Sequence, residues 1–362
     1  MPNVGIDASM LERDRTGIGN YVFNLLVRYR RVRPEARVVL FSNGRVSDEA
    51  RALGDCVDGV FSPLRKGPLW LSTGLPALLR EHRIDVFWGG NGYLPLVVPR
   101  GIRQVVTIHD FVYRHAGHTL PRISLWSRRV LQPLAIRQAN AVVCVSQSTA
   151  DELLAHHGRA ADAVLEPPID PSYKPAGAPD VDAVCRRYEL PARFLLTTGT
   201  LEPRKNLVVL LSAYVRAREA GAELPLLVLA GKLGWLADDI RAAMDDAAAR
   251  GFVRFLGYVP LELMPALYSA AEAFVFLPLY EGFGMPAREA LLCGTPVIAS
   301  DIAALREATG GLARLVSPDR ASIERLFREY PATGPPPARA WPAHRDESLD
   351  EAAERFAAVL AP

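Results

Sequence analysis

Two glutamates stand eight residues apart around a glycine-rich turn, and this spacing suits the recognition of a sugar. Glu281 and Glu289 both lie in the segment 279–292. The segment before it, 273–278, is short, apolar and rich in aromatic residues, which predicts a buried strand. Pro286 suits the first turn of a helix, where its missing N–H costs nothing. We therefore expect Glu281 at a strand end and Glu289 about one turn into the next helix.

The chemistry that this arrangement offers is the binding of an anion and a diol. Gly282 relieves the backbone at the turn, and the amides of Phe283, Gly284 and Met285 are expected to face outward at the positive end of the helix. A phosphate suits that position, and a carboxylate that accepts two hydrogen bonds suits a ribose or sugar diol. Acidic residues that merely complement a helix dipole are an equal alternative for either glutamate alone. The whole arrangement favours a nucleotide-sugar site.

Two adjacent cations form a second candidate site. Arg204 and Lys205 occupy a turn between a predicted strand, 194–198, and a predicted helix, 207–219. Such a pair can neutralise a pyrophosphate and stabilise a departing nucleoside diphosphate. No Asp-x-Asp signature of a divalent metal adjoins this turn, so we expect neither a metal nor another cofactor. The alternative is a solvated turn.

Length and composition fit a soluble globular protein with two domains. The chain has 362 residues, of which 49% are hydrophobic and 23% charged, and no apolar run is long enough to cross a bilayer. The four cysteines show no C-x-x-C spacing, which argues against a zinc site or a disulfide framework. His115 and His118 lie in a loop without regular spacing, which argues against a metal there. No signal peptide is evident, so the cytoplasm is the expected compartment.

Strand-like and helix-like segments alternate along the whole chain, which predicts parallel sheets covered on both faces. The proline-rich stretch 166–175 blocks helix and central strand alike and is interpreted as a linker. A proline-rich surface loop is expected at 331–337, and the segment 348–360 has helical periodicity. Further strands are expected at 4–7, 38–41, 86–88, 105–108, 141–145, 226–230, 253–256 and 297–299.

Two loops of the N-terminal half carry further candidates. Gly17 and Gly19 precede a helix and allow close approach of a ligand to the backbone, although simple helix entry explains a lone G-x-G equally well. His109 follows a predicted strand, where a neutral imidazole can donate a hydrogen bond into a cleft; a turn-capping role is the alternative. Asp110 could orient His109, bind an acceptor or cap. Asp7 and Ser146, at two other strand ends, are candidates on the acceptor side.

Six motifs in order resemble the retaining family-4 (group 1) glycosyltransferases of the GT-B fold. The E-x7-E motif is 281–289, and the resemblance spans about residues 3–317. The other motifs are 16–20 (TGIGN), 107–110 (TIHD), 145–148 (VSQS), 199–206 (GTLEPRKN) and 230–235 (AGKLGW).

The resemblance implies an architecture and several residue roles. It implies two doubly wound Rossmann-like domains facing each other across a cleft: an acceptor domain at 1–172, a nucleotide-sugar domain at 173–345, and a C-terminal helix at 346–362 that crosses back. His109 is implied to contact the transferred sugar. Many members carry Arg directly after Gly199, where this chain has Thr200, so Arg204 is expected to take over part of that role. The loop 257–260, with Val259, is implied to hold the base.

The activity implied is retaining, metal-independent transfer of a sugar from a nucleoside-diphosphate donor to a hydroxyl. Catalytic roles fall to His109, Arg204, Lys205 and Glu281, while Glu289 binds the ribose. Similarity to bacterial mannosyltransferases points to GDP-mannose and to a glycan or lipid-linked acceptor in surface polysaccharide or lipopolysaccharide synthesis. A UDP-sugar donor stays open. So do a GT-B sugar-nucleotide epimerase and a non-catalytic nucleotide-sugar-binding protein.

Charge is divided unevenly along the chain. Residues 1–172 hold 21 Lys and Arg against 16 Asp and Glu, a balance of +5, and the remainder holds 21 against 24, a balance of −3. A basic surface that also bears tryptophans suits anionic lipid headgroups on the inner face of a membrane. An ordinary solvated face is an equal alternative. No nucleic-acid motif is present. The residues concerned are Arg28, Arg30, Arg31, Arg33, Arg65, Lys66, Arg122, Arg128 and Arg129, with Trp70 and Trp126.

Overall fold

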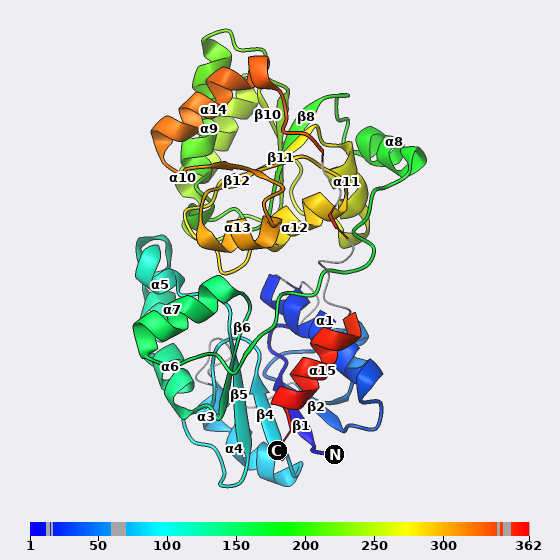
Figure 1. Ribbon diagram of the computed structural model, residues 1–362, viewed down its shortest axis with the longest axis vertical. Coiled ribbons are helices and arrows are strands. Elements are labelled where there is room, and N and C mark those ends of the chain that lie inside the picture. Colours follow the sequence, from blue (N-terminus) through cyan, green and yellow to red (C-terminus); the bar gives the residue numbers. More distant parts are fainter. Residues whose placement is uncertain (12–14, 16, 59–69, 339–340, 343–348, 362) are drawn as a thin grey trace. The chain divides into compact units, whose positions relative to one another are not determined.

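Two sheets of parallel strands organise the chain, each in a unit of its own (Figure 1). The computed structural model describes residues 1–11, 15, 17–58, 70–338, 341–342 and 349–361. Unit 1 comprises Met1–Phe111, Arg122–Pro168 and Asp346–Pro362, and unit 2 comprises Val112–Pro121 and Ile169–Arg345. The passage from unit 1 to unit 2 at residues 168–169 falls inside the proline-rich stretch 166–175.

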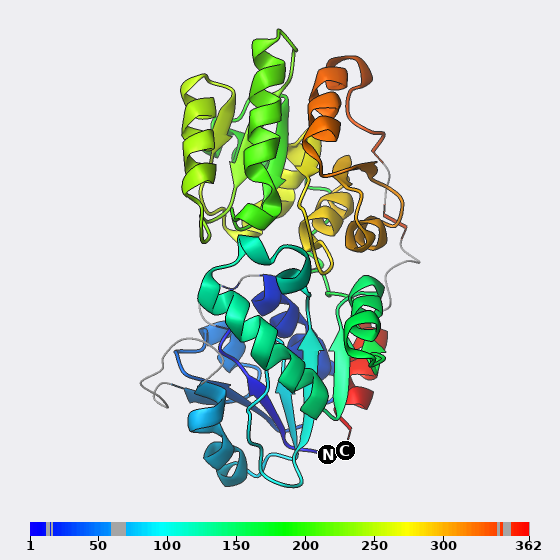
Figure 2. The same cartoon turned by 90° about the vertical axis from the view of Figure 1, so that its left-hand side faces the viewer.

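The sheet of unit 1 has strand order β3-β2-β1-β4-β5-β6-β7 and is parallel throughout. The order reverses between β1 and β4, which is the position where doubly wound sheets bind ligands. Figure 2 shows α6 running across one face of this sheet. The strands are β1 (Val4–Asp7), β2 (Val38–Ser42), β3 (Asp55–Asp58), β4 (Val86–Gly89), β5 (Arg103–Ile108), β6 (Ala141–Cys144) and β7 (Ala163–Val164). The helices are α1 (Gly17–Val32), α2 (Asp48–Arg51), α3 (Trp70–Thr73), α4 (Leu75–Glu81), α6 (Arg122–Gln138), α7 (Gln147–His157) and α15 (Leu349–Val359).

The last helix, α15, packs against α1 within unit 1. The ring of Phe356 lies edge-on to Trp88 of β4 at 4.6 Å and to Tyr29 of α1 at 5.8 Å, measured between ring centroids. Glu354 accepts two hydrogen bonds from Arg33, at 2.6 and 2.9 Å. The C-terminal segment is therefore part of the core of unit 1, although it lies far from α1 and β4 in the sequence.

The sheet of unit 2 repeats the same plan with strand order β10-β9-β8-β11-β12-β13, again parallel. Its order reverses between β8 and β11. The strands are β8 (Phe194–Thr198), β9 (Leu226–Ala230), β10 (Val253–Phe255), β11 (Ala273–Phe276), β12 (Val297–Ser300) and β13 (Arg314–Val316). The helices are α5 (Val112–His115), η1 (Gly117–Thr119), α8 (Ala178–Arg187), η2 (Pro203–Lys205), α9 (Leu207–Glu219), α10 (Asp238–Ala249), η3 (Leu261–Leu263), α11 (Met264–Ala270), α12 (Met285–Leu292), α13 (Ala303–Thr309) and α14 (Arg320–Thr333).

Alternation along each strand builds two cores, one on either face of the second sheet. On β8, Leu195 packs toward α9, α10 and α14, while its neighbours Phe194 and Leu196 pack toward α8, α11 and α12. In Figure 1, α9, α10 and α14 lie to one side of the sheet and α8 and α11 to the other. Because successive side chains of a strand point to opposite faces, the near-continuous apolar strands of the sequence are what such a sheet requires.

Residues 112–121 depart from the division expected from sequence. They lie in the first half of the chain, between β5 and α6, yet their contacts join them to unit 2. The ring of His115 stacks on Tyr280 at 4.9 Å, and Trp235 donates its indole N–H to the carbonyl of Thr119 at 2.9 Å. Contacts of this kind leave no apolar run in the sequence from which the placement could be predicted.

The strands and helices follow the predicted pattern, with three additions and one correction. All the predicted strands are present, whereas the short, mostly half-exposed β3, β7 and β13 carry too few apolar residues to be predicted. The loop expected at 331–337 begins later, because α14 continues through Pro331 to Thr333. In the parts of the chain that the structure describes, no helix is both long and apolar enough to cross a bilayer.

We predict that Phe356→Ala destabilises the protein strongly. The buried ring holds α15 against α1 and β4, and removing such a ring costs about 3–5 kcal/mol. The thermal midpoint should fall by on the order of 10 °C. Ala358→Ser, at an exposed position of the same helix, is the control and should shift the midpoint little. Equal midpoints for the two variants would show that α15 is not part of the folded core.

Candidate functional site

A cluster of four charged side chains, each between 2% and 17% exposed, lies at the carboxyl edge of the second sheet, in the loops that follow β8 and β11. Lys205 donates from Nζ to Glu281 Oε1 at 2.5 Å, and Arg204 Nη1 lies 2.8 Å from Glu281 Oε2. The same guanidinium donates to Glu202 Oε1 from Nη2 at 2.6 Å and from Nε at 2.9 Å. One carboxylate, Glu281, therefore joins both predicted cations.

Electrostatics keep Glu281 ionised. Burial alone would raise the pKa of this carboxyl, but the charges of Arg204 and Lys205 and their hydrogen bonds outweigh it and hold the pKa below its ordinary value. The two cations and two carboxylates of the cluster balance in formal charge. The ionised Glu281 therefore holds both cations at one point.

Glycines let the loops around this cluster approach one another closely. Gly199 has a φ of +120°, and a Cβ at Gly231 would lie 1.9 Å from the carbonyl oxygen of Gly199. Gly231 in turn donates its N–H to Gly257 O at 2.7 Å. Any side chain at Gly231 would force apart the loops after β8 and β9. Thr200 lies beside this contact, half-buried, where its methyl group faces Gly234.

The turn before α12 has the predicted form. Gly284 caps the helix with a φ of +109°, and a Cβ there would lie 2.3 Å from Leu305 Cδ2, so only glycine fits. Phe283 is buried and Met285 half-buried. Among the described residues, the amides of Phe283 and Gly284 donate to no protein acceptor. These N–H groups at a helix N-terminus are available to an anion.

Glu289 of α12 is oriented by a tyrosine that sequence analysis does not identify. Tyr268 of α11 donates its hydroxyl to Glu289 Oε2 at 3.0 Å, and this hydroxyl lies 2.8 Å from Thr198 Oγ1 at the end of β8. Burial raises the pKa of Glu289 to about 7, against the lowering effect of the Tyr268 hydrogen bond. No motif marks Tyr268, because it sits in an apolar helix where the sequence indicates only core packing.

Glu202 and Tyr280 are two further residues that sequence analysis does not place in the site. Glu202 lies inside the GTLEPRKN motif, so its spacing of two from Arg204 is the signal that could have revealed it. Tyr280 supplies a backbone carbonyl to Arg204 Nη1 at 3.1 Å. Val259, the predicted base-binding residue, is buried in the loop 257–260. Beside it, the ammonium of Lys232 lies 4.6 Å from the ring centroid of Tyr258.

His109 lies in unit 1, at the carboxyl end of β5. Its Nε2 donates to the carbonyl of Gly90 at 2.6 Å, and its ring meets Tyr21 edge-on at 5.0 Å. Burial lowers the pKa of this imidazole, so the ring is neutral near pH 7. Because a carbonyl only accepts, Nε2 carries the hydrogen and Nδ1 carries a lone pair. The neutral ring can therefore accept a hydrogen bond through Nδ1, where the sequence-based expectation had it donating.

Each acceptor-side candidate has a structural partner in unit 1. Asp7 accepts from the amide of Ser9 at 3.1 Å and from the side-chain amide of Asn91 at 2.6 Å; burial raises its pKa to about 6. Asp110 pairs with Arg128 at 3.0 Å. Ser146 caps α7 by accepting from the amide of Thr149 at 2.9 Å. Local structure accounts for all three, and their role toward an acceptor stays a prediction.

The glycine-rich loop before α1 is only partly described, since Thr16 lies outside the described residues. Helix α1 begins at Gly17, so both glycines lie in its first turn and not before it. A Cβ at Gly19 would lie 2.5 Å from the carbonyl oxygen of Met10, whereas a Cβ at Gly17 would meet no described atom within 4 Å. Gly19 is thus required by packing, and Gly17 leaves room for a ligand.

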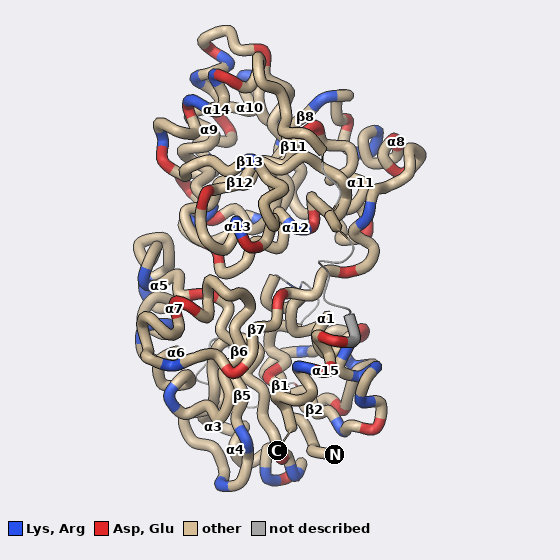
Figure 3. Tube along the Cα trace, in the orientation of Figure 1, with Lys and Arg blue, Asp and Glu red and all other residues tan. Residues whose placement is uncertain are grey.

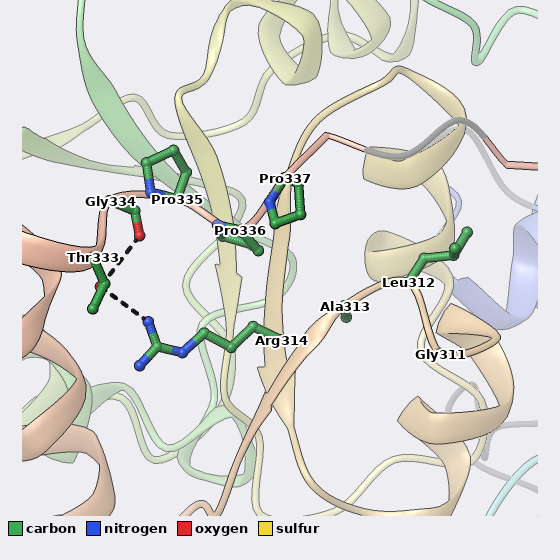
Figure 4. Close-up of a pocket in the computed structure, with 9 residues that line it drawn as sticks. All are labelled: Gly311, Leu312, Ala313, Arg314, Thr333, Gly334, Pro335, Pro336 and Pro337. Carbon is green, nitrogen blue, oxygen red and sulfur yellow. Dashed lines mark hydrogen bonds between the residues drawn. The ribbon is translucent and has the colours of Figure 1, made fainter.

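One hollow of unit 2 is not lined by any of these residues. It has a volume of about 430 Å³ and lies between the start of β13 and the loop after α14, where Arg314 donates to Thr333 (Figure 4). Three consecutive prolines, Pro335–Pro337, form one wall. Proline has no backbone N–H, so this wall offers no donor to a phosphate or a sugar.

Comparison with known proteins separates the two halves of the chain in the same way. The family model described as Glycosyltransferase Family 4 matches residues 15–173, and that described as Glycosyl transferases group 1 matches residues 189–324. An O-antigen chain mannosyltransferase B of Escherichia coli is 30% identical over 324 residues, which cover 84% of each chain. A 2-deoxystreptamine glucosyltransferase of Streptomyces kanamyceticus is 26% identical, covering 81% of this chain and 80% of that one.

Solved structures share the fold over nearly the whole chain. WaaG, a glycosyltransferase involved in lipopolysaccharide biosynthesis, superposes with a TM-score of 0.71 at 14% identity, covering 97% of this chain and 93% of that one. The sucrose-phosphate synthase of Thermosynechococcus elongatus gives 0.71 at 18% identity, covering 99% and 95%. With two doubly wound parallel sheets, two family models and a full-length relative in agreement, the chain belongs to the family-4, group 1 glycosyltransferases of the GT-B fold.

Proposed function

We propose that this protein transfers mannose from GDP-mannose to a hydroxyl of a glycan or lipid-linked acceptor during synthesis of a surface polysaccharide, with retention at the anomeric carbon. The relatives support the sugar and the product class: the E. coli protein named above and three serotype-specific mannosyltransferases WbdA, also of E. coli, carry mannosyltransferase in their names. The match to WbdA spans 53% of this chain and 24% of the relative at 30–32% identity.

The observation that carries the proposal is the buried cluster of Arg204, Lys205 and Glu281 beside the N-terminus of α12. A diphosphate seated there would meet the two cations and the amides of Phe283 and Gly284 together. Arg204 already donates to Glu202, Tyr280 O and Glu281, so it mainly holds the carboxylate in place. Lys205, with three donors on one ammonium, is the more available cation for the leaving diphosphate.

The chemical steps follow from these positions. As the bond from the anomeric carbon to the diphosphate breaks, negative charge grows on the phosphate oxygens and Lys205 stabilises it. The acceptor hydroxyl attacks on the same face of the sugar and gives its proton to the leaving phosphate. Glu281 binds sugar hydroxyls and, as an ionised group, stabilises positive charge at the anomeric carbon. His109 accepts, at Nδ1, a hydrogen bond from a hydroxyl of the transferred sugar.

Glu289 and Tyr268 hold the nucleotide in this proposal. Tyr268 occupies Oε2 of Glu289, which fixes the plane of the carboxylate. The remaining oxygen accepts from the ribose diol. Val259 and the backbone of the loop 257–260 contact the base.

The experiment that tests the function compares donors. GDP, UDP and ADP are screened by thermal shift, and then GDP-mannose and the UDP-sugars are assayed for transfer to a mannose-terminated oligosaccharide. GDP should stabilise the protein most, and only GDP-mannose should give product with retained configuration by NMR. Product from a UDP-sugar alone would replace the proposed donor and leave the family intact.

Two other functions are tested by the same assay. A sugar-nucleotide epimerase would convert its donor without any acceptor. A non-catalytic binding protein would bind nucleotide and turn nothing over. We expect a non-catalytic binding protein to have lost Arg204, Lys205 or Glu281, and the presence of all three favours catalysis.

We predict that transfer does not need a divalent metal. The two cations supply the charge that a metal would bring to the diphosphate. Activity in excess EDTA should equal activity with added magnesium. Loss of activity in EDTA that manganese restores would contradict this.

We predict that Lys205→Met lowers kcat by about 30- to 1,000-fold, because an oriented charge of this kind contributes roughly 2–4 kcal/mol in the transition state. Affinity for the nucleoside diphosphate should fall less. Arg216→Met, which removes a largely exposed cation of α9, is the control and should leave both quantities unchanged. A raised donor KM with unchanged kcat would assign Lys205 to binding alone.

We predict that the two glutamates fail differently. Glu289→Gln should weaken the free diphosphate and the sugar nucleotide alike, with a modest effect on kcat, since its contact is the same in substrate and transition state. Glu281→Gln should reduce kcat strongly and spare diphosphate affinity. Calorimetry gives the diphosphate affinity of each variant, and rates at saturating donor give its kcat. If both variants lose the same quantity, or each loses the one expected of the other, the roles are misassigned.

We predict opposite pH effects of Glu289 on stability and on binding. The folded pKa of about 7 lies above the ordinary value of 4.5, so the charged carboxylate destabilises the fold as pH rises through this range. Glu289→Gln should therefore stabilise the free protein at about pH 8, by on the order of 1–3 kcal/mol, and little at about pH 5.

Nucleotide binding should follow the opposite trend, because the diol requires the charged form. The affinity of the wild type for GDP should fall between about pH 8 and pH 6 more steeply than the affinity of Glu289→Gln. The variant is the control for the titration of GDP itself, which affects both proteins equally. Tyr268→Phe, which removes the hydrogen bond but keeps the ring, should move the midpoint upward. Parallel pH curves for the wild type and Glu289→Gln would overturn the assignment.

A further inference from the structure

Helix α6 of unit 1 carries a stripe of exposed apolar side chains along one face. Residues at these spacings project within a sector of roughly 80°, at 100° per residue. The opposite face is buried through Leu131, Ala135 and Ile136. The stripe consists of Ile123, Trp126, Val130 and Leu134, which are 84%, 56%, 38% and 41% exposed. A helix with one buried face needs only polar residues on the other, so this stripe calls for an occupant.

The charge around the stripe is positive without exception within the helix. The sequence of α6 contains four arginines and no aspartate or glutamate. Arg122 and Arg129 are exposed and project along one flank of the stripe, and the exposed Arg137 falls within its sector near the end of the helix, whereas Arg128 turns inward to pair with Asp110. Figure 3 shows Lys and Arg positions of α6 in blue. The stripe is thus bordered by cations that can meet an anionic partner.

The apolar surface continues beyond the end of the helix. Gln138, the last residue of α6, donates from Nε2 to the carbonyl of Pro95 at 2.6 Å. The two residues that follow Pro95 are Leu96 and Val97, both exposed, and Arg100 is exposed shortly after them. The loop thus adds two apolar side chains and a further cation at one end of the stripe.

We propose that α6 and the loop 95–97 form a docking face for an anionic lipid bilayer. Apolar side chains with a tryptophan, bordered by arginines, are what an interfacial helix inserts below the headgroups. The stripe is one helix wide and about 17 Å long from Ile123 to Leu134. A stable protein interface buries roughly 800 Å² on each partner, which a stripe of four side chains does not supply. The cations favour phosphate headgroups over an apolar protein surface.

Several arginines of the basic surface expected from sequence are engaged within the fold of unit 1. Arg28 is buried, Arg30 donates to the carbonyl of Ala36, and Arg33 pairs with Glu354, so these arginines serve the fold of unit 1. Arg65 and Lys66 lie outside the described residues, and the side chain of Trp70 is not described. Of the described arginines in that expected surface, Arg31 of α1 is also exposed, and those of α6 border the apolar stripe. The inference does not depend on which donor the enzyme uses.

Vesicle sedimentation of the full chain tests it. Phosphatidylcholine vesicles are compared with vesicles that contain roughly a third phosphatidylglycerol, at low and high salt. We expect binding to the anionic vesicles that weakens with salt. Ile123→Glu with Val130→Glu should reduce it by at least about tenfold. Val208→Glu, at an exposed apolar position of α9, is the matched control and should bind like the wild type.

A second pair of variants keeps the test independent of any packing change. Arg122→Gln and Arg129→Gln should each reduce anionic-vesicle binding roughly fivefold and leave the thermal midpoint unchanged. Failure of the wild type to bind, equal binding to both kinds of vesicle, or unchanged binding of the Ile123→Glu, Val130→Glu variant would overturn the proposal. A concentration-dependent dimer in ultracentrifugation that Ile123→Glu abolishes would assign the face to a second copy instead.

Discussion

The shared carboxylate of Glu281 is the interaction on which the rest of the candidate site depends. Two cations from one loop converge on an acid from another, out of bulk water. Buried ions are costly unless paired, so neither loop can keep its conformation without the other. The distance between the ends of β8 and β11 is thereby fixed. The amide of Leu279, which donates to the carbonyl of Arg204 at 2.9 Å, adds a backbone link to the same junction.

This junction coincides with the reversal of strand order between β8 and β11. At such a position the two neighbouring loops diverge to opposite faces of the sheet and leave an opening between them. Gly199, Gly231 and Gly284 keep side chains out of the surrounding loops, each at a positive φ. Topology thus supplies the space, glycine keeps it open, and the ion cluster lines it with oriented charge. Sequence motifs mark all three contributions, because each needs a particular residue type.

The sequence predicts those features that require a particular residue type or periodicity, and it misses those that depend on how elements pack. The buried strands of both sheets and the helix 207–219 are predicted, since periodicity and length specify them. Residues that act through another residue are missed. Tyr268 sits in an apolar helix, and its hydroxyl reaches Glu289 only because α11 and α12 pack on one face of the sheet. The contacts that place residues 112–121 with unit 2 include a ring stack and a hydrogen bond to a backbone carbonyl, and such contacts leave no periodic pattern in the sequence.

Two carboxyls with similarly raised pKa values show how burial alone fails to identify a site. Asp7 has a pKa of about 6 and Glu289 of about 7, both because of burial. In Asp7 both oxygens accept hydrogen bonds, from Ser9 and Asn91, so the group completes a turn at the end of β1. In Glu289 the described residues supply a donor to one oxygen alone, from Tyr268. A buried carboxylate oxygen without a donor does not stabilise the fold, but it can accept a hydrogen bond from a hydroxyl group of a ligand. On this count the fold supplies donors to both oxygens of Asp7, whereas Glu289 keeps an oxygen that, in our proposal, accepts from the ribose.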